Sequence, residues 1–157
     1  MKYFGGVFAY NCLPEKIKTP AILIVNLDPD YKPGSHWTAI YLNTEGHSTF
    51  FDSFGRYPPK NILNFMKKSS QTWDYNNCLL QDFESDVCGQ YCVLFLAFCM
   101  NNNNLNDYIS MFSNNYLNND MLVRKMFLEH FTTIAIKNVH RNHEFVMQSC
   151  QKCFCGK

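Results

Sequence analysis

Apolar and polar residues alternate along the chain with periods that predict several strands. Residues 21–25 are a continuous aliphatic, β-branched run, which predicts a buried strand. Residues 37–42 and 48–52 predict two more strands, and Thr44-Glu45-Gly46 between them suits a three-residue hairpin loop. Residues 73–81 predict another strand.

Four other segments have helical patterns. Residues 60–68 space their apolar positions as a short amphipathic helix, whereas residues 87–100 are apolar nearly all round and predict a buried helix. Residues 106–112 predict a short helix, and Asp120 is expected to cap a helix running to about residue 135. Together the elements predict an α+β fold, in which a small central mixed sheet packs on the buried helix.

Composition sets limits on the kind of protein. The chain has 157 residues, of which 46% are hydrophobic and 16% aromatic, values typical of one globular domain. We expect this domain over residues 1–137 and a basic, Cys/His-rich tail over residues 138–157. No apolar run is long enough to span a membrane and no secretory signal pattern is present, so we expect no membrane partner.

Charge and cysteine content refine this picture. The formal net charge of +1 argues against a general nucleic-acid binder, yet residues 121–157 hold six Lys/Arg against two Glu. A solvated helix face and tail explain this basic region, with DNA or an acidic partner as the alternative. Cys92 and Cys99, among eight cysteines, lie within the apolar helix pattern, where they behave as small hydrophobes. We expect free thiols in an intracellular, reducing compartment.

Candidate chemistry centres on Cys88 at the start of the apolar helix. A helix N-terminus stabilises anions, and the thiolate is the reactive form of cysteine. His36, Asp52 and Gln81 precede it in the chain and could serve as base, orienting carboxylate and amide donor to an oxyanion. Each residue alone has an ordinary structural explanation, but the ordered set predicts cysteine-protease chemistry.

The predicted hairpin places two of these residues together. A loop at residues 44–46 sets Asn43 opposite His47 and Asp52 opposite Thr38, so Asp52 becomes the diagonal neighbour of His36. Such neighbours have Cβ atoms up to ~7 Å apart, within reach of their side chains. A slip of one residue would turn Asp52 to the other face. Gly89, beside the nucleophile, could let a substrate backbone approach closely.

Several segments resemble a known family, the adenovirus endopeptidase (adenain) family, and more distantly the SUMO- and ubiquitin-like-protein deconjugating cysteine proteases. The order His, Asp, Gln, Cys is the specific part of the resemblance, which runs over most of the chain. The similar segments are residues 3–6, 24–26, 35–39, 51–55, 88–92 and 127–130, together with Gln81 seven positions before Cys88.

The resemblance implies the fold of this superfamily, with the catalytic cysteine at the N-terminus of the buried helix. It also implies a triad and an oxyanion-hole glutamine, formed by His36, Asp52, Cys88 and Gln81. A narrow cleft for glycine is typical of the family, and we expect Trp37 and Gly89 to bind substrate there.

The implied activity is endopeptidase cleavage after glycine, at Gly-Gly or Gly-X-Gly sites in capsid-type precursors of a DNA virus or a virus-like DNA transposon. By analogy the protein acts in the nucleus or the virion, and DNA or a peptide could activate it. We expect a monomer that requires no cofactor. The chain is shorter than adenain. Cys78 lies in the broad region of that family's activator-linked cysteine, but its spacing differs, so the role is not carried over to it.

Two alternatives remain open: a SUMO-type deconjugating isopeptidase, and a catalytically inactive relative that serves as a binding or assembly module. A thiol-redox role lacks support, because three residues rather than two separate Cys88 from Cys92. The chain also has no HExxH zinc-hydrolase motif.

The tail contains zinc-type ligands at close spacing: His140, His143, Cys150, Cys153 and Cys155. Their spacing matches no zinc module known to us, which favours a plain basic tail over a zinc site. Zinc bound there would be structural or would serve an interaction.

Overall fold

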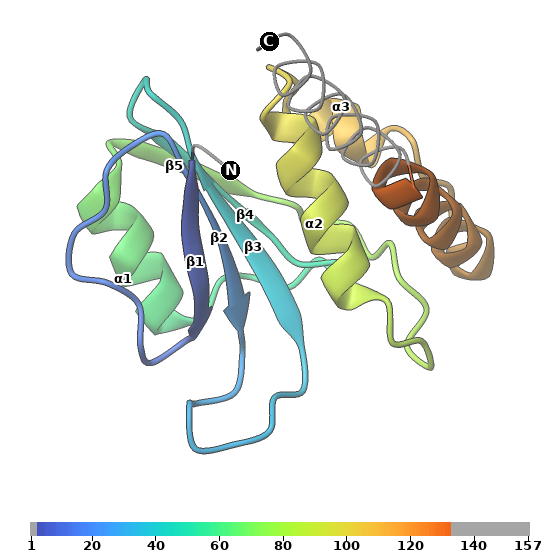
Figure 1. The fold of residues 1–157 in the computed structure, drawn as a ribbon, viewed down its shortest axis with the longest axis horizontal. Helices are drawn as coiled ribbons and strands as arrows, with labels where there is room; N and C mark the ends of the chain where they lie inside the picture. Colours follow the sequence, from blue (N-terminus) through green and yellow to red (C-terminus); the bar gives the residue numbers. More distant parts are fainter. Residues whose placement is uncertain (1–2, 133–157) are drawn as a thin grey trace, which may run out of the picture. The chain divides into compact units, whose positions relative to one another are not determined.

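The computed structural model describes residues 3–132 and contains a five-stranded mixed sheet in the order β1-β2-β3-β4-β5 (Figure 1). The two inner strand pairs are antiparallel, and the two outer pairs, β1 with β2 and β4 with β5, are parallel. Residues 116–132 are also helical. The other elements are β1 (Phe4–Ala9), β2 (Ala21–Asn26), β3 (Trp37–Leu42), β4 (His47–Phe51), α1 (Lys60–Ser69), β5 (Thr72–Tyr75), α2 (Cys88–Cys99) and α3 (Leu105–Ile109).

Both faces of the sheet are covered, which explains why its central strands are apolar on both sides (Figure 1). The face toward α1 buries alternate residues of β2, β3 and β4, including Leu23, Ile40 and Phe50. On the other face Phe51 stacks on Phe95 of α2 at 4.7 Å between ring centroids. Helix α2 therefore lies against the middle of the sheet, as the all-round apolar pattern predicts, and the predicted α+β class is confirmed.

The hairpin register follows the sequence prediction. Ala39 pairs with Phe51 and Ile40 with Phe50, and the Asn43 N–H donates to the His47 carbonyl at 3.0 Å. Gly46 has φ +79°, a left-handed conformation that glycine adopts without steric cost. The register that sets Asp52 on the same face as His36 is therefore confirmed.

Two element predictions are wrong, and one strand is missing from the prediction. The strand expected over residues 73–81 ends at Tyr75, because the side chain of Asn76 hydrogen-bonds the backbone of Asp52 and the chain leaves the sheet. Strand β1 was not predicted, since its glycines and half-exposed edge position hide any alternation. Asp120 is no helix cap: the helix begins at residue 116, and the Asn115 side chain accepts the Asn118 N–H at 3.1 Å.

The chain divides into two compact units, residues 1–123 and residues 124–157. All of the sheet, α1, α2 and α3 lie in the first unit. The boundary expected at residue 137 and the cysteine-rich tail fall outside the described residues. Within the described part of the chain, no helix combines the length and apolar character needed to cross a bilayer.

Candidate active site

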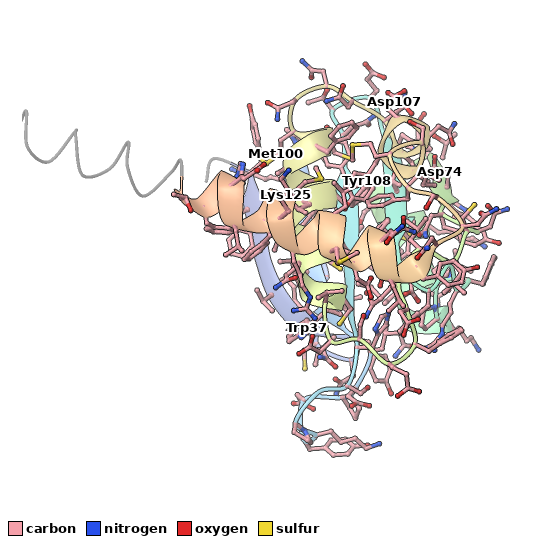
Figure 2. The ribbon with its side chains drawn as sticks, turned by 90° about the vertical axis from the view of Figure 1, so that its right-hand side faces the viewer. Trp37, Asp74, Met100, Asp107, Tyr108 and Lys125 are labelled. Atoms are coloured by element: carbon pink, nitrogen blue, oxygen red, sulfur yellow. The ribbon has the colours of Figure 1, made fainter. Side chains whose placement is uncertain are left out.

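Three separate elements bring the candidate residues to one end of the sheet. His36 directly precedes β3, Asp52 directly follows β4, and Cys88 is the first residue of α2. Trp37 of β3 lies near the end where α2 begins, and Met100 lies at the opposite end of that helix (Figure 2). The site is therefore built at the junction of the central hairpin and the buried helix.

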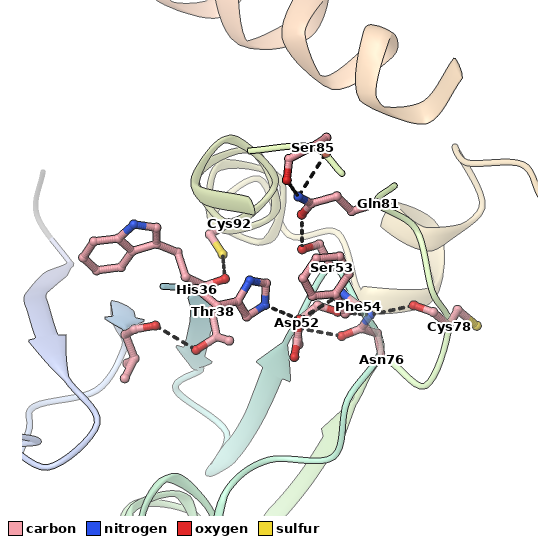
Figure 3. A network of polar contacts seen from close by, with 12 residues as sticks. His36, Thr38, Asp52, Ser53, Phe54, Asn76, Cys78, Gln81, Ser85 and Cys92 are labelled. Atoms are coloured by element: carbon pink, nitrogen blue, oxygen red, sulfur yellow. Dashed lines mark hydrogen bonds and ion pairs between the residues drawn. The ribbon is translucent and has the colours of Figure 1, made fainter. Parts of the chain in front are cut away.

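His36 and Asp52 form a buried pair (Figure 3). The Nε2 atom of His36 lies 2.6 Å from Oδ1 of Asp52, and neither residue is more than 6% exposed. The same carboxylate oxygen accepts the backbone N–H of Phe54 at 2.9 Å, while the other oxygen, Oδ2, is buried without a hydrogen-bond partner. A buried carboxylate with an unpaired oxygen is costly unless a nearby positive charge balances it, which favours a protonated His36.

The electrostatics of His36 match this arrangement. Burial by itself lowers the pKa of the imidazole, but hydrogen bonds and charge interactions with Asp52 and Cys88 raise that pKa from 6.5 to about 9. Because Asp52 occupies Nε2, the ring nitrogen left for the Cys88 sulfur is Nδ1. The imidazole thus links a carboxylate on one side to a thiol on the other.

Cys88 has the surroundings of a reactive thiol. Burial alone raises the pKa of its thiol, but a hydrogen bond from His36, backbone N–H groups of Trp37 and Gly89, and the charge of His36 bring the pKa below its ordinary value. Val87 is the N-cap residue of α2 and provides no capping side chain, and the first turn of the helix holds no acidic residue. The positive end of the helix is therefore available to the sulfur.

Residues that the sequence did not single out hold Asp52 in place. Asn76, 1% exposed, accepts the Asp52 N–H at 2.8 Å and donates to the Asp52 carbonyl at 2.6 Å. Gly55 has φ +67°, and a Cβ there would lie 2.6 Å from the carbonyl carbon of Cys78. The turn after β4 therefore packs directly against the backbone of residue 78, with no room for a side chain.

Gln81 is fixed by two serines (Figure 3). Its Oε1 accepts the Ser53 hydroxyl at 2.6 Å, and its Nε2 donates to the Ser85 carbonyl at 2.9 Å and the Ser85 hydroxyl at 3.1 Å. A carbonyl only accepts, so this contact fixes which end of the amide carries the hydrogens. Both amide hydrogens face Ser85 in this structure, and the oxyanion role of Gln81 stays a prediction.

The backbone on both sides of Gln81 is anchored by α2 and by the helix that begins at residue 116. The Leu80 carbonyl accepts from Asn119 Nδ2 at 3.0 Å and from the Tyr91 hydroxyl at 3.2 Å. The Asp82 N–H donates to Asp120 at 3.3 Å, and Asp120 also accepts the Tyr91 hydroxyl at 3.0 Å. Asp120 is thus a buried anchor for the segment that carries Gln81.

Trp37 and Gly89 lie beside each other at the start of α2. A Cβ built on Gly89 would lie 3.7 Å from Cδ1 of Trp37, an ordinary van der Waals contact. The Cys92 thiol of α2 donates to the Trp37 carbonyl at 3.3 Å, which ties β3 to the helix one turn beyond Cys88. Substrate binding by Trp37 and Gly89 stays a prediction.

The structure thus brings His36, Asp52 and Cys88 together and sets Gln81 beside Ser53, the neighbour of Asp52. The sequence assigned no role to Ser53 or Phe54, although both lie in the Phe51–Gly55 segment, and it gave no signal for Asn76 or Ser85. The Asn76 and Ser53 contacts join residues 24 and 28 positions apart, whereas Ser85 binds Gln81 only four positions away. The zinc-type residues His140, His143, Cys150, Cys153 and Cys155 lie outside the described part of the chain.

Comparisons with known proteins find similarity among solved structures. No protein-family model matches the sequence, and no curated protein matches it. Two crystal structures of the ASFV pS273R protease, one in selenomethionine form, are similar to this chain with 21% and 22% identity and TM-scores of 0.48 and 0.49. The similar regions cover 59% and 57% of this chain but only 39% and 36% of those proteases.

Proposed function

We propose that this protein is a cysteine endopeptidase with the triad His36, Asp52 and Cys88. One observation supports this proposal most directly: the His36 ring contacts both of the other residues. Its Nε2 lies 2.6 Å from the Asp52 carboxylate, and the ring also forms a hydrogen bond with the Cys88 side chain. The raised pKa of His36 and the lowered pKa of Cys88 both favour an imidazolium–thiolate pair in the resting protein.

The geometry supports a two-step hydrolysis. The Cys88 thiolate attacks the substrate carbonyl carbon, and the Cys88 backbone N–H stabilises the oxyanion, joined by the Gln81 amide when one of its hydrogens turns from Ser85 to the substrate. As the C–N bond breaks, His36 gives its proton to the leaving amine and a thioester remains on Cys88. A water molecule, deprotonated by His36, then attacks the thioester, which releases the carboxylic acid product and restores the Cys88 thiolate beside the protonated His36.

For the substrate we propose cleavage after glycine, at Gly-Gly or Gly-X-Gly sites of capsid-type precursor proteins. The motif resemblance suggests this specificity. The position of Trp37 next to Gly89 supports it, because the Trp37 ring beside the nucleophile leaves little space for a substrate side chain, and a substrate glycine has none. No metal or cofactor takes part in the proposed steps. DNA or a peptide as activator belongs to the same proposal.

The test is cleavage of peptides with a Gly-Gly-X or Gly-X-Gly site, each matched by a peptide with alanine in place of the glycine before the cleaved bond. Wild-type protein and Cys78→Ala, which alters an exposed cysteine outside the site, should cleave only the glycine peptides; Cys88→Ala should cleave neither. Mass spectrometry of the products locates the cleaved bond. Each reaction is repeated with added DNA, and a SUMO conjugate serves as a second substrate.

Each outcome is decisive. Equal cleavage by wild type and Cys88→Ala would overturn the proposal. Binding of the glycine peptides without cleavage, with or without DNA, would replace it with the inactive binding module. Turnover of the SUMO conjugate alone would replace the endopeptidase with a deconjugase.

A further inference from the structure

A column of aromatic rings extends outward from His36. The ring of Phe54 stacks on the imidazole at 4.7 Å between centroids with an interplanar angle of 20°, and Phe83 stacks on Phe54 at 5.3 Å and 21°. Phe54 is half-buried beside the His36–Asp52 pair (Figure 3), whereas Phe83 is 66% exposed. The column therefore runs from a proposed catalytic group into solvent.

Local hydrogen bonds fix Phe83 at the outer end of this column. It is the second residue of a turn that the Ser85 N–H closes onto the Asp82 carbonyl at 3.2 Å, and the Asp82 carboxylate accepts the Glu84 N–H at 2.9 Å. This turn lies between Gln81 and Cys88. Because about two-thirds of Phe83 is exposed, it buries little apolar area and contributes little to the stability of the fold. An aromatic residue at this position is therefore not required for packing.

The proposed mechanism indicates which part of the substrate lies next to the aromatic column. The acyl half of the substrate stays bonded to Cys88, while the leaving amine takes its proton from His36. The chain that follows the cleaved bond must therefore leave along His36, the residue against which the column is stacked. An aromatic surface is well suited to bind a large apolar or aromatic side chain there.

We propose that Phe54 and Phe83 form a subsite for the substrate on the leaving side of the cleaved bond, with Phe83 its specificity-determining residue. The inference rests on the proposed endopeptidase function. Two stacking steps of 4.7 and 5.3 Å correspond to about two to three residues of extended chain, which advances ~3.4 Å per residue. The preferred substrate has an aromatic or large aliphatic residue at the second or third position after the cleaved bond.

Charges of both signs lie near the column. The Arg56 guanidinium lies 4.8 Å from the centre of the Phe54 ring, and the turn that holds Phe83 carries the carboxylates of Asp82 and Glu84. Substrate side chains without charge therefore test recognition by the apolar surface alone. A serine at the recognised position loses this contact without meeting a repulsive group.

The experiment compares two peptides that are identical up to the glycine at the cleaved bond and carry either Phe or Ser at the second and third positions beyond it. The kcat/KM ratio for the pair is measured for wild type, Phe83→Ala, Phe83→Leu and Phe4→Ala. Phe4, 48% exposed on edge strand β1, provides the matched control. A ratio taken within one protein is independent of the active fraction of each preparation.

Wild type and Phe4→Ala should prefer the Phe peptide by about tenfold, Phe83→Ala by less than about twofold, and Phe83→Leu by an intermediate factor. Equal rates for the two peptides with wild type, or an unchanged ratio in Phe83→Ala, would overturn this inference and leave the endopeptidase proposal intact. Absence of any Cys88-dependent cleavage would overturn both.

Discussion

Asn76 binds the backbone of Asp52 on both its donor and its acceptor side, with hydrogen bonds of 2.8 and 2.6 Å. Neither atom pair is exposed, and Asp52 is the carboxylate that orients His36. The position of the proposed triad thus depends on a residue 24 positions further along the chain, at the end of β5. We expect this contact to matter for both stability and activity.

Replacing Asn76 with alanine should lower the free energy of unfolding by about 2–4 kcal/mol, because it leaves the buried N–H and carbonyl of Asp52 without their partners. Denaturant unfolding measures the change. The neighbouring exposed Asn77 provides the control, since Asn77→Ala removes no hydrogen bond from Asp52. Equal losses in the two variants would show that the backbone clamp contributes nothing.

Asp52→Asn should reduce kcat/KM less than His36→Ala does. The asparagine retains a hydrogen bond to the ring but removes the charge that raises the pKa of His36, for which we expect a loss of about 10–100-fold. His36→Ala removes the proton donor itself, for which we expect about 1000-fold or more. Losses of equal size would mean that Asp52 does more than orient and charge the imidazole.

Alkylation by iodoacetamide should single out Cys88 below neutral pH. At pH 6.5 an ordinary thiol is about 1% thiolate, whereas the lowered pKa of Cys88 should make it label about tenfold faster than the exposed Cys78. Burial raises the pKa values of Cys92 and Cys99, which should stay unlabelled in the folded protein. Mass spectrometry distinguishes the sites.

The sign of the pH dependence follows from the two shifts. The thiolate–imidazolium pair forms as pH rises through the lowered pKa of Cys88 and is lost as pH rises through about 9, where His36 gives up its proton. Catalysis should therefore have a plateau between these limits. His36→Ala should shift the onset of fast Cys88 labelling to higher pH; an unchanged onset would contradict the ion pair.

Replacement by alanine should affect the stability of the fold strongly at one glycine and little at another. Gly55→Ala should destabilise the fold by about 2–4 kcal/mol, because φ is +67° and the new Cβ would lie within 2.9 Å of the Cys78 backbone nitrogen. Gly89→Ala should change stability by less than ~1 kcal/mol, since its Cβ has room at 3.7 Å from Trp37 and alanine favours a helix.

Activity separates the two glycines further. Gly89→Ala should lower kcat/KM on glycine-site peptides by about tenfold or more while its thermal transition stays near that of wild type. Full activity in Gly89→Ala would show that substrate does not approach residue 89 closely.

The contribution of Gln81 is testable through its partners. Gln81→Ala should lower kcat/KM by about 100–1000-fold if its amide stabilises the oxyanion. Ser85→Ala removes the hydroxyl that binds one amide hydrogen but keeps the carbonyl that orients the group, so we expect a change of less than about threefold. A large loss in Ser85→Ala would assign the essential contact to the serine hydroxyl instead.

The sequence by itself determined the elements whose pattern is local. The hairpin loop at residues 44–46 sets the register, and a period of two then fixes the face on which His36 and Asp52 meet. The apolar run after Cys88 is likewise sufficient to predict a buried helix with the cysteine at its start. The order and spacing of these residues were therefore sufficient to propose the triad, because a hairpin and the start of a helix are determined by nearby residues.

Only the tertiary structure decided what surrounds these residues. The predicted strand over residues 73–81 ends before Asn76, because the Asn76 side chain hydrogen-bonds the Asp52 backbone. Asp120 hydrogen-bonds the segment that carries Gln81 and does not cap a helix. Phe54 stacks on both His36 and Phe83, although Phe83 lies 29 positions after Phe54 in the chain. Such contacts join distant segments through side chains packed in three dimensions, and no local periodicity encodes them.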